Sequence, residues 1–347
     1  MHTLRPDWIA GALALALTAG PALAAPPARP RLGAWFTYWD LAAGVASAAR
    51  HPNLLSDRFL FVIQLDDSGR PIPANPALAL KPAAQPAGGA WMTVVNDVRD
   101  ADGHVTRKDA AVVHALLADP KRRAEHAGRI AALARKLGFT GVDIDYENLR
   151  PEDRDRFSIF IRELAARLRP QHLRLAVTVQ PKRRDGSAAG PGAIDWAAIC
   201  RHADRLQIML YPLHHPRTTP GPLATPDWIQ EILAFAAGQC DPARVVPALN
   251  VGGMDWGPKG DSGISFDQAR ELARMLRAEI GREGNSDVPA FHYSVNGETH
   301  AVYYEDARSL MKKIDAITAL GYPAVMFWSL GHEDPALLDA LARRRPP

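Results

Sequence analysis

The sequence predicts an α/β fold, a (β/α)8 barrel with a small α+β insertion after the seventh strand. Eight apolar runs of strand length lie along the chain, and helical patterns separate most of them, which favours one barrel over two small sheets. The fourth run also carries acidic residues on one side, as expected of a strand whose end forms a site. The chain has 347 residues, of which 47% are hydrophobic, enough for the core of a barrel of about 250 residues.

The predicted strands lie, in order, at 32–39, 58–64, 91–96, 142–147, 173–180, 206–211, 244–251 and 324–329. Their apolar and β-branched residues are bounded by turn-forming residues, which is typical of strands. Helical patterns occupy 108–118, 121–136, 152–168, 195–202 and 228–237. Strands that alternate with helices predict a parallel sheet that is covered by helices.

The insertion is predicted at 252–304. It contains a helical pattern at 266–279, followed by two strand-like runs on either side of Asn296-Gly297. Asn-Gly between such runs is a strong signal for a two-residue hairpin turn. We expect this segment to form one wall of a cleft.

Residues 1–24 are predicted to be a cleavable signal peptide. Arg5 precedes an apolar run at 9–19, and Ala22-Leu23-Ala24 fits an A-x-A cleavage site. This run is too short to span a bilayer, and no later stretch is long enough; an uncleaved anchor is the alternative. Residues 25–30 are then a Pro-rich leader and residues 31–347 the barrel. The mature protein is expected in the periplasm or outside the cell, as a monomer.

Charge and cysteine content exclude several classes of partner. A net charge of +3 is too small to indicate nucleic acid or an anionic membrane. The cysteines and histidines show no metal-ligand spacing, so we expect no metal and no other cofactor. Cys200 and Cys240 lie at the ends of predicted helices that precede strands six and seven. Because adjacent barrel helices end at the same face, a disulfide between them is predicted for an oxidising compartment.

The fourth strand alternates between an apolar side and an acidic side. The apolar side has Val142, Ile144 and Tyr146, and the acidic side has Asp143, Asp145 and Glu147. Neighbours on one side of a strand lie about 6.5–7 Å apart, so the three carboxylates disfavour one another's ionisation. A fold gains nothing from this arrangement, whereas an acid–base catalyst needs a protonated acid beside ionised carboxylates. The alternative is an amphipathic strand whose acidic side faces water.

This segment resembles the D-G-x-D-x-D-x-E signature that glycoside hydrolase family 18 carries on the fourth strand of a (β/α)8 barrel. Gly141, Asp143, Asp145 and Glu147 match the signature, and Thr140 stands at its first acidic position. The resemblance implies a glycosidase that needs no cofactor and acts on a GlcNAc-containing glycan.

Later segments resemble the same family. Met209-Leu210-Tyr211-Pro212 is similar to its M-x-Y-D motif on strand six, with Pro212 in place of the acid. Trp328 matches the strand-eight tryptophan that lies beneath the sugar. Segments 220–228 and 304–312, with the helix and hairpin of the insertion, resemble the bacterial spore-cortex and cell-wall N-acetylglucosaminidases within the family. The LysM wall-binding repeats usual in that group do not occur in this sequence.

The resemblance implies substrate-assisted retaining catalysis, in which the 2-acetamido oxygen of the sugar attacks the anomeric carbon. Glu147 would be the general acid, and Asp145 would orient the acetamido N–H. Asp143 would share a proton with Asp145, and Tyr211 would donate its hydroxyl to the acetamido oxygen. Tyr211 and Trp328 could instead serve only in packing.

Other candidate sugar contacts lie near the predicted strand ends or in the insertion: Trp35, Tyr38, Trp39, Asn96, Gln180, Met209 and Trp256. For the aromatic residues, plain packing is the alternative. The Lys-Arg-Arg run at 182–184 is predicted to be a solvated loop face, with binding of an anionic wall polymer as the alternative.

The predicted function is hydrolysis of β-linked GlcNAc-containing polysaccharide, either peptidoglycan or a chitin-like polymer. The alternative is a binding protein of weak or no activity on the same barrel. Retention of Glu147 and Asp145 favours the enzyme, whereas Thr140 and Pro212 favour the binding protein.

Overall fold

The computed structural model describes residues 29–75, 89–186 and 188–344. The predicted signal peptide at 1–24 and most of the Pro-rich leader lie outside these described residues. Within the described ranges, no helix is both long enough and apolar enough to cross a membrane.

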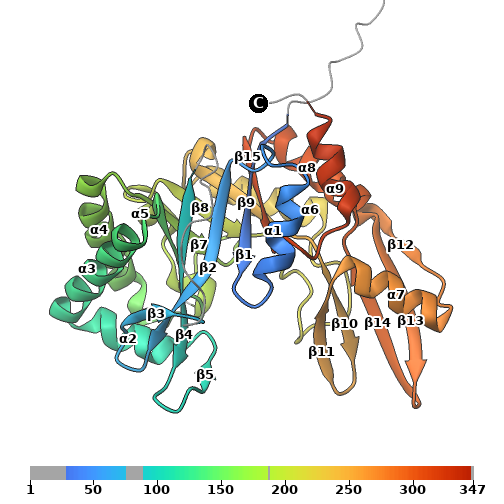
Figure 1. The fold of residues 1–347 in the computed structure, drawn as a ribbon, viewed down its shortest axis with the longest axis horizontal. Helices are drawn as coiled ribbons and strands as arrows, with labels where there is room; N and C mark the ends of the chain where they lie inside the picture. Colours follow the sequence, from blue (N-terminus) through green and yellow to red (C-terminus); the bar gives the residue numbers. More distant parts are fainter. Residues whose placement is uncertain (1–28, 76–88, 187, 345–347) are drawn as a thin grey trace, which may run out of the picture.

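Eight parallel strands form a closed barrel (Figure 1). In order around the barrel they are β1 (Arg31–Thr37), β2 (Asp57–Asp66), β4 (Ala90–Arg99), β6 (Gly141–Asp145), β7 (Arg174–Val179), β8 (Arg205–Met209), β9 (Val245–Asn250) and β15 (Ala324–Trp328). Two short strands, β3 (Pro71–Pro73) and β5 (Val105–Thr106), pair antiparallel with β2 and β4. The predicted barrel is confirmed, and each predicted strand overlaps one of the eight.

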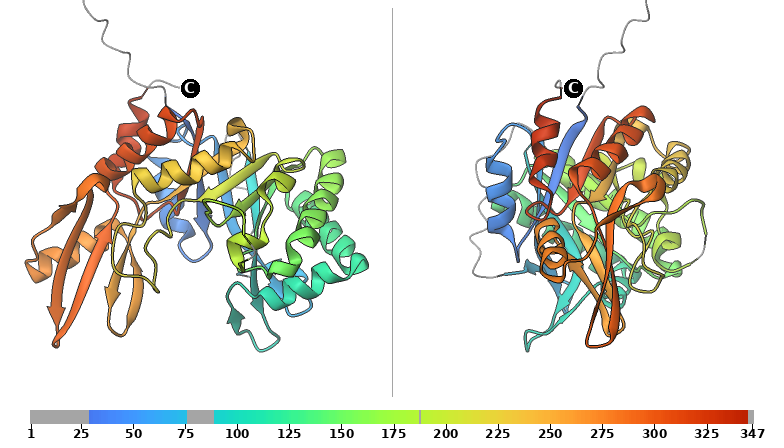
Figure 2. Two further views of the ribbon diagram at one scale, coloured as in Figure 1. Left: turned by 180° about the vertical axis from the view of Figure 1, so that it is seen from behind. Right: turned by 90° about the vertical axis from the view of Figure 1, so that its right-hand side faces the viewer.

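Helices cover the outside of the barrel (Figure 2). They are α1 (Leu41–Ala49), α2 (Ala110–Ala118), α3 (Pro120–Leu137), α4 (Arg154–Leu168), α5 (Trp196–Cys200), α6 (Pro226–Ala237), α8 (Ala307–Ala319) and α9 (Pro335–Ala342). The bounds of α3 follow from its sequence. The Asp119 carboxylate accepts the backbone N–H of Lys121 at 2.8 Å, and Pro120 occupies the first turn. Gly138 ends the helix at φ 75°, a conformation that favours glycine.

The inside of the barrel is filled by its own apolar cluster, distinct from the larger cluster that includes the helices. Trp91 lies near its N-terminal end, where the indole N–H donates to Asp57 at 2.8 Å and the Arg205 guanidinium lies 4.8 Å from the ring. A Cβ at Gly141 would lie 2.4 Å from a Trp91 ring carbon. Packing against Trp91 therefore explains the glycine that begins the acidic strand.

The segment between β9 and α8 forms a second, antiparallel sheet in the order β11-β10-β14-β13-β12. Its elements are β10 (Gly253–Gly257), β11 (Gly260–Ile264), α7 (Phe266–Leu276), β12 (Gly281–Glu283), β13 (Val288–Val295) and β14 (Glu298–Tyr304). The sequence predicted α7 and the β13–β14 hairpin; the structure adds three further strands. This insertion sheet projects from the barrel on the same side as the β4–β5 hairpin (Figure 1).

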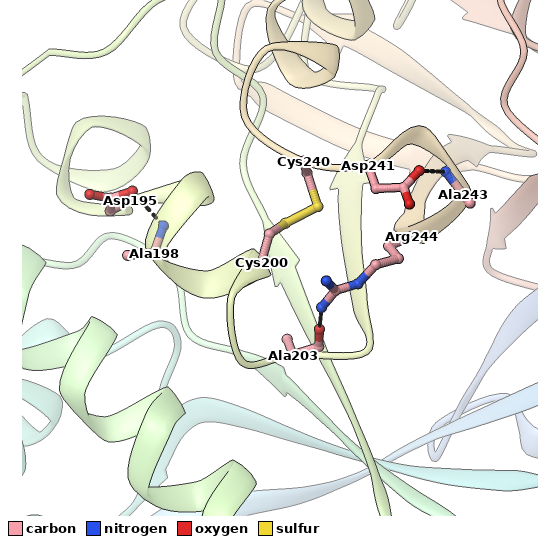
Figure 3. The surroundings of a disulfide bond; sticks show 8 residues. All are labelled: Asp195, Ala198, Cys200, Ala203, Cys240, Asp241, Ala243 and Arg244. Atoms are coloured by element: carbon pink, nitrogen blue, oxygen red, sulfur yellow. Dashed lines mark hydrogen bonds between the residues drawn. A yellow bond between two sulfur atoms is a disulfide. The ribbon is translucent and has the colours of Figure 1, made fainter.

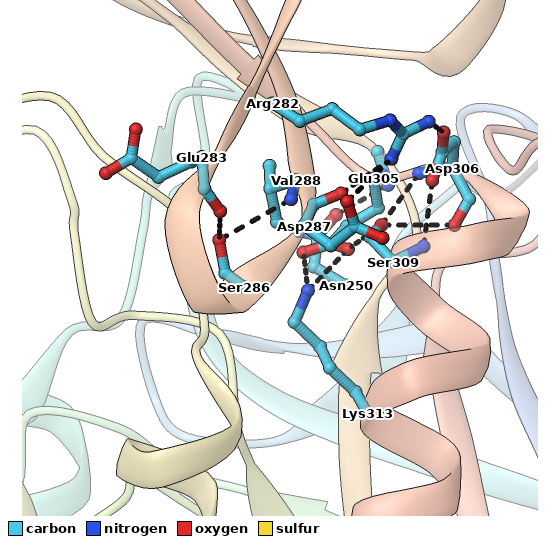
Figure 4. Close-up of polar contacts among 11 residues, drawn as sticks. Asn250, Arg282, Glu283, Ser286, Asp287, Val288, Glu305, Asp306, Ser309 and Lys313 are labelled. Carbon is cyan, nitrogen blue, oxygen red and sulfur yellow. Dashed lines mark hydrogen bonds and ion pairs between the residues drawn. The ribbon is translucent and has the colours of Figure 1, made fainter.

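A buried ion pair lies where the insertion sheet returns to the barrel (Figure 4). Glu305 directly follows β14 and Lys313 lies in α8. The Lys313 ammonium is 2.8 and 2.7 Å from the two carboxylate oxygens of Glu305, and the side chains are 1% and 3% exposed. The Ser309 hydroxyl donates to the same carboxylate at 2.6 Å. The Glu305 N–H also donates to the carbonyl of Gly252 at 2.9 Å, which joins the two ends of the insertion.

Cys200 and Cys240 form a disulfide, with their Cα atoms 5.7 Å apart (Figure 3). Cys200 is the last residue of α5, and Cys240 lies shortly after α6. The bond therefore joins the ends of two neighbouring helices. Beside it, the Arg244 guanidinium donates to the carbonyl of Ala203 (Figure 3). The two cysteines are 40 residues apart, and β8 lies in the loop they close.

Candidate active site

Asp143 is the most deeply buried of the three acidic residues of the β6 segment. Its carboxylate accepts four hydrogen bonds of 2.8 to 3.1 Å, donated by Trp35, Thr93, Thr178 and Gln207. Burial raises the pKa of Asp143, and these hydrogen bonds oppose the shift. Among the described residues no hydrogen bond joins Asp143 to Asp145, so the predicted shared proton stays a prediction.

Asp145 ends β6 and is 5% exposed. Its Oδ2 accepts a hydrogen bond from the Lys108 ammonium at 3.1 Å, whereas Oδ1 has no partner among the described residues. Burial raises the pKa of Asp145 to about 7; Lys108 opposes the shift, and the charges of Glu147 and Asp143 add to it. A buried carboxylate oxygen without a partner, in a residue that lines a cleft, is suited to accept an N–H from a ligand.

Asn96, in the C-terminal half of β4, holds the backbone of Glu147. Its side-chain N–H donates to the Glu147 carbonyl at 3.0 Å, and its side-chain oxygen accepts the Glu147 N–H, also at 3.0 Å. Asn96 was predicted to contact substrate, and in this structure its side chain contacts the Glu147 backbone. The side chain is fully buried, and both ends of its amide are bonded to Glu147. Asn96 therefore fixes the direction in which the Glu147 side chain leaves the strand end.

Lys108 is a charged residue of this site that the sequence analysis missed. Its ammonium lies 2.8 Å from Glu147 Oε1 and 3.1 Å from Asp145 Oδ2. Burial lowers the pKa of Lys108, but the two carboxylates raise it by more, so the net shift is upward. The backbone N–H of Lys108 donates to Asp97 Oδ1 at 3.0 Å, just after the β4–β5 hairpin. Asp102-Gly103, a hairpin-forming dipeptide, was the available signal that the chain turns back here.

The carboxylates open into a cleft of about 520 Å³. Its lining residues are Trp35, Tyr38, Trp39, Phe61, Asp97, Val105, Arg107, Lys108, Asp145, Glu147, Thr178, Met209, Tyr211 and Trp328. Trp328 packs edge-on against Phe61, with ring centroids 5.0 Å apart, and Trp39 is 56% exposed. The structure thus brings together most of the predicted sugar contacts, in a cleft with apolar faces and convergent polar groups.

Tyr211 lines the cleft just after β8. Burial and the negative charges of Asp145, Glu147 and Asp143 raise the pKa of Tyr211 well above its ordinary value. Its hydroxyl therefore keeps its proton and is available as a donor at neutral pH.

Gln180 and Trp256 lie outside the cleft. Gln180 lines a neighbouring groove of about 790 Å³, together with Asn148 and Pro212. Trp256 is 5% exposed, and its ring packs edge-on against Tyr303 within the insertion sheet. For Trp256 these contacts favour the alternative of plain packing over a sugar contact.

The Lys-Arg-Arg run at 182–184 was predicted to be a solvated loop face, and this is wrong for Lys182. The Lys182 ammonium donates to Asp185 at 2.7 Å and to the carbonyl of Ile194 at 2.5 Å, and the residue is buried. Burial lowers the pKa of Lys182, and Asp185 opposes the shift. Lys182 therefore supports its loop, whereas Arg183 and Arg184 are exposed.

One group of side chains in the described ranges has the spacing of a metal site. The ligand atoms of Asp100, Asp102 and His104 lie within 4.8 Å of one another at the exposed tip of the β4–β5 hairpin. Asp100 Oδ1 already accepts the backbone N–H groups of Asp102 and His104, at 3.0 and 2.9 Å. These contacts explain the cluster as a turn, and none of its members lines the cleft.

Comparison with known proteins decides the family. Residues 112–333, more than half of the chain, match the model described as Glycosyl hydrolases family 18. The chain belongs to this family. The match includes the three carboxylates, Tyr211 and Trp328, and family 18 membership places the chain among the glycosidases.

Individual relatives agree with the family 18 assignment. The cortical fragment-lytic enzyme of Bacillus anthracis is 27% identical over 233 residues, which are 64% of this chain and 53% of that protein. The chain thus spans about half the length of several curated relatives that it matches.

Two solved structures share the family 18 barrel. The spore cortex-lytic enzyme SleL of Bacillus cereus has a TM-score of 0.79 at 23% identity, over 91% of this chain and 75% of that one. A chitinase from Chromobacterium violaceum has a TM-score of 0.77 at 22% identity, over 90% of this chain and 98% of that one. At these identities the likeness shows the fold.

The two departures from the family 18 motifs lie at different ends of the barrel. The Thr140 hydroxyl donates to the carbonyl of Ala90, the first residue of β4, at 3.0 Å. It therefore lies at the N-terminal end of the barrel, opposite the cleft. Pro212 lines the neighbouring groove. Pro212 directly follows Tyr211, which lines the cleft, so the carboxylate of the family motif is missing beside this tyrosine.

Proposed function

We propose that the protein is a secreted, monomeric glycosidase that cleaves β-linked GlcNAc-containing polysaccharide, peptidoglycan or chitin-like, by substrate-assisted retaining catalysis. The observation that carries this proposal is the placement of Asp145 and Glu147 in a cleft lined by Tyr211 and Trp328, with Asp143 buried beneath. Family membership and a relative named as a cortical fragment-lytic enzyme support it. Secretion is inferred from the predicted signal peptide.

In the first step, Glu147 donates its proton to the glycosidic oxygen while the bond from that oxygen to the anomeric carbon breaks. The acetamido oxygen of the sugar above Trp328 attacks the same carbon and closes an oxazolinium ring. Asp145 accepts the acetamido N–H through the oxygen that lacks a partner in the described residues, and its charge stabilises the ring. Tyr211 donates to the acetamido oxygen and orients it for attack.

In the second step, Glu147, now ionised, takes a proton from a water molecule, whose oxygen adds to the anomeric carbon. The ring opens and the acetamido group is restored. Two inversions at one carbon give retention of configuration. A deacetylated substrate lacks the attacking oxygen and is not expected to be cleaved.

The test is to incubate the purified protein with chito-oligosaccharides and with peptidoglycan, and to identify the products by mass. NMR of fresh product should show the β-anomer first from a β-linked substrate, and a thiazoline mimic of the cyclic intermediate should inhibit. Appearance of the α-anomer first would mean inversion and would refute this mechanism. Glu147→Gln is the matched control, since it removes the transferable proton and keeps the size of the side chain.

A glycan-binding protein without hydrolytic activity is the second candidate. The ion pair between Lys108 and Glu147 favours it, because an acid paired with a cation has to lose that partner before it can donate a proton. Calorimetric binding of chito-oligosaccharides, without any product by mass after prolonged incubation, would select this candidate.

A further inference from the structure

Lys108 is a charged group in the cleft that the proposed mechanism does not use. A general acid has to come within about 2.6–3.2 Å of the oxygen that it protonates. Lys108 Nζ lies 2.8 Å from Oε1 of Glu147. When Oε1 is the donating oxygen, these two distances place the ammonium, as it lies in this structure, within roughly 6 Å of the scissile oxygen. Lys108 can therefore bind a substrate group that is attached to a carbon next to the one that carries the scissile oxygen.

The backbone of Lys108 is fixed, whereas its side chain can be reached by a ligand. The backbone N–H is held by Asp97, and the pairing of Val98 with Thr106 closes the hairpin that precedes it. The Lys108 side chain is 21% exposed and lines the cleft. A four-carbon stem with a compact charge can exchange one carboxylate partner for another without backbone movement.

The cleft is lined by three carboxylates, those of Asp97, Asp145 and Glu147, and by two cations, Arg107 and Lys108. An anionic group of a substrate is therefore favoured where it contacts Lys108, and not elsewhere in the cleft. A neutral sugar that separates Lys108 from Glu147 and Asp145 leaves the ammonium with fewer charged partners, whereas a substrate carboxylate would replace them. Arg107 lines the same cleft and adds a second positive charge. Without these cations, the protein carboxylates would repel an anionic substrate.

We propose that Lys108 is a specificity-determining residue, which binds a carboxylate on the leaving sugar and thereby frees Glu147 for proton transfer. This inference rests on the proposed function. In a 1→4-linked chain the scissile oxygen is O4 of the leaving sugar, and O3 is attached to the neighbouring carbon. The substrate class is therefore an amino-sugar glycan whose leaving sugar carries a 3-O-carboxyalkyl ether, as muramic acid does.

The same chemistry sets the order of reactions on such a glycan. When a peptide is amide-linked to the ether's carboxyl group, the negative charge is lost and Lys108 has no anion to bind. A reaction that hydrolyses this amide must therefore supply the substrate that Lys108 selects.

The test compares kcat/KM on three substrates. They are peptide-free strands of alternating GlcNAc and muramic acid, the same strands with their carboxyl groups converted to methylamides, and neutral chito-oligosaccharides. We expect wild type to prefer the free carboxylate by about 10- to 100-fold, the usual worth of a hydrogen bond between charged groups. Lys108→Met should abolish this preference by losing activity on the carboxylate strands, and Lys108→Arg should retain it. Lys136→Met, which removes an exposed lysine from the last turn of α3, is the control for charge.

Equal kcat/KM of wild type on the carboxylate and methylamide strands would overturn the inference. So would a similar loss on all three substrates in a Lys108→Met variant whose thermal unfolding is unchanged, because Lys108 would then only support the site. If wild type cleaves none of the substrates, the proposed function fails. The inference is then decided by calorimetric affinities of wild type and Lys108→Met for the two kinds of strand, where an equal affinity of wild type for both would overturn it.

Discussion

Removing the ammonium of Lys313 is expected to destabilise the protein strongly. Lys313 and Glu305 are 1% and 3% exposed in their side chains, and the ammonium contacts both carboxylate oxygens within 2.8 Å. In Lys313→Met, the Glu305 charge would keep the Ser309 hydroxyl as its side-chain donor but lose its counter-ion. Breaking a buried ion pair from one side typically costs about 3–5 kcal/mol, and we expect a loss of that size in the free energy of unfolding.

The double variant Glu305→Gln/Lys313→Met tests the reason for this loss. It removes both charges, so no unpaired charge remains, and we expect it to be more stable than Lys313→Met by at least about 1 kcal/mol. Urea unfolding followed by circular dichroism and by tryptophan fluorescence gives the free energies, provided that the two transitions coincide. A loss below about 1 kcal/mol in Lys313→Met, or losses of the single variants that simply add, would refute the reasoning.

Glu147→Gln should lower kcat by about 10³-fold or more and keep the affinity for sugar, because only the transferable proton is lost. A variant that retains most of its activity would exclude Glu147 as the general acid. Asp145→Asn should lower kcat far more than affinity in steady-state and calorimetric measurements, and equal losses would contradict its role in the transition state. The pKa of Asp145 is raised from 3.8 to about 7, so the folded state binds more protons between these values. The free energy of unfolding should therefore fall as pH rises from about 4 to about 7, and urea unfolding of Asp145→Asn should show a flatter dependence. In Cys200→Ser/Cys240→Ser the free energy of unfolding should fall by about 4 kcal/mol, because the unfolded chain regains the entropy that a 40-residue closed loop removes. An unchanged urea midpoint would contradict this.

The barrel could be predicted because its buried strands are short apolar runs between turn-forming residues. Two of the elements that were missed lack such a contrast, whereas α8 was missed although Leu310, Ile314 and Ile317 form an apolar stripe. α1 reads LAAGVASAA, in which alanine and glycine give no clear apolar stripe, and β11 reads GDSGI, with Ile264 as its one large apolar residue. β11 forms because it pairs along its length with β10. Such cross-strand support depends on the partner strand and is not visible in the local sequence.

The part of the candidate site that lies on one strand could be predicted from the alternation of side chains along that strand. Alternation alone places Asp143, Asp145 and Glu147 on the same side. Lys108 comes 37 residues before Asp145 and reaches it because β4 lies beside β6 and a hairpin carries the chain back over the strand ends. Asn96 was predicted to end its strand, whereas β4 continues to Arg99. Its role depends on burial and on the neighbouring strand, which the sequence does not show.

The disulfide has a practical consequence for measurements on the cleft. Cys200 and Cys240 are the two cysteines of the sequence, and they lie at helix ends that lead into the N-terminal ends of β8 and β9, away from the cleft. Replacing both with serine leaves a thiol-free background for attaching spectroscopic labels. A label on Val105 in the β4–β5 hairpin and another on Ser262 in β11 would sit on two exposed parts that flank the barrel mouth. Their separation, recorded with and without glycan, is expected to stay the same, because the ammonium changes partners without movement of the hairpin that positions Lys108.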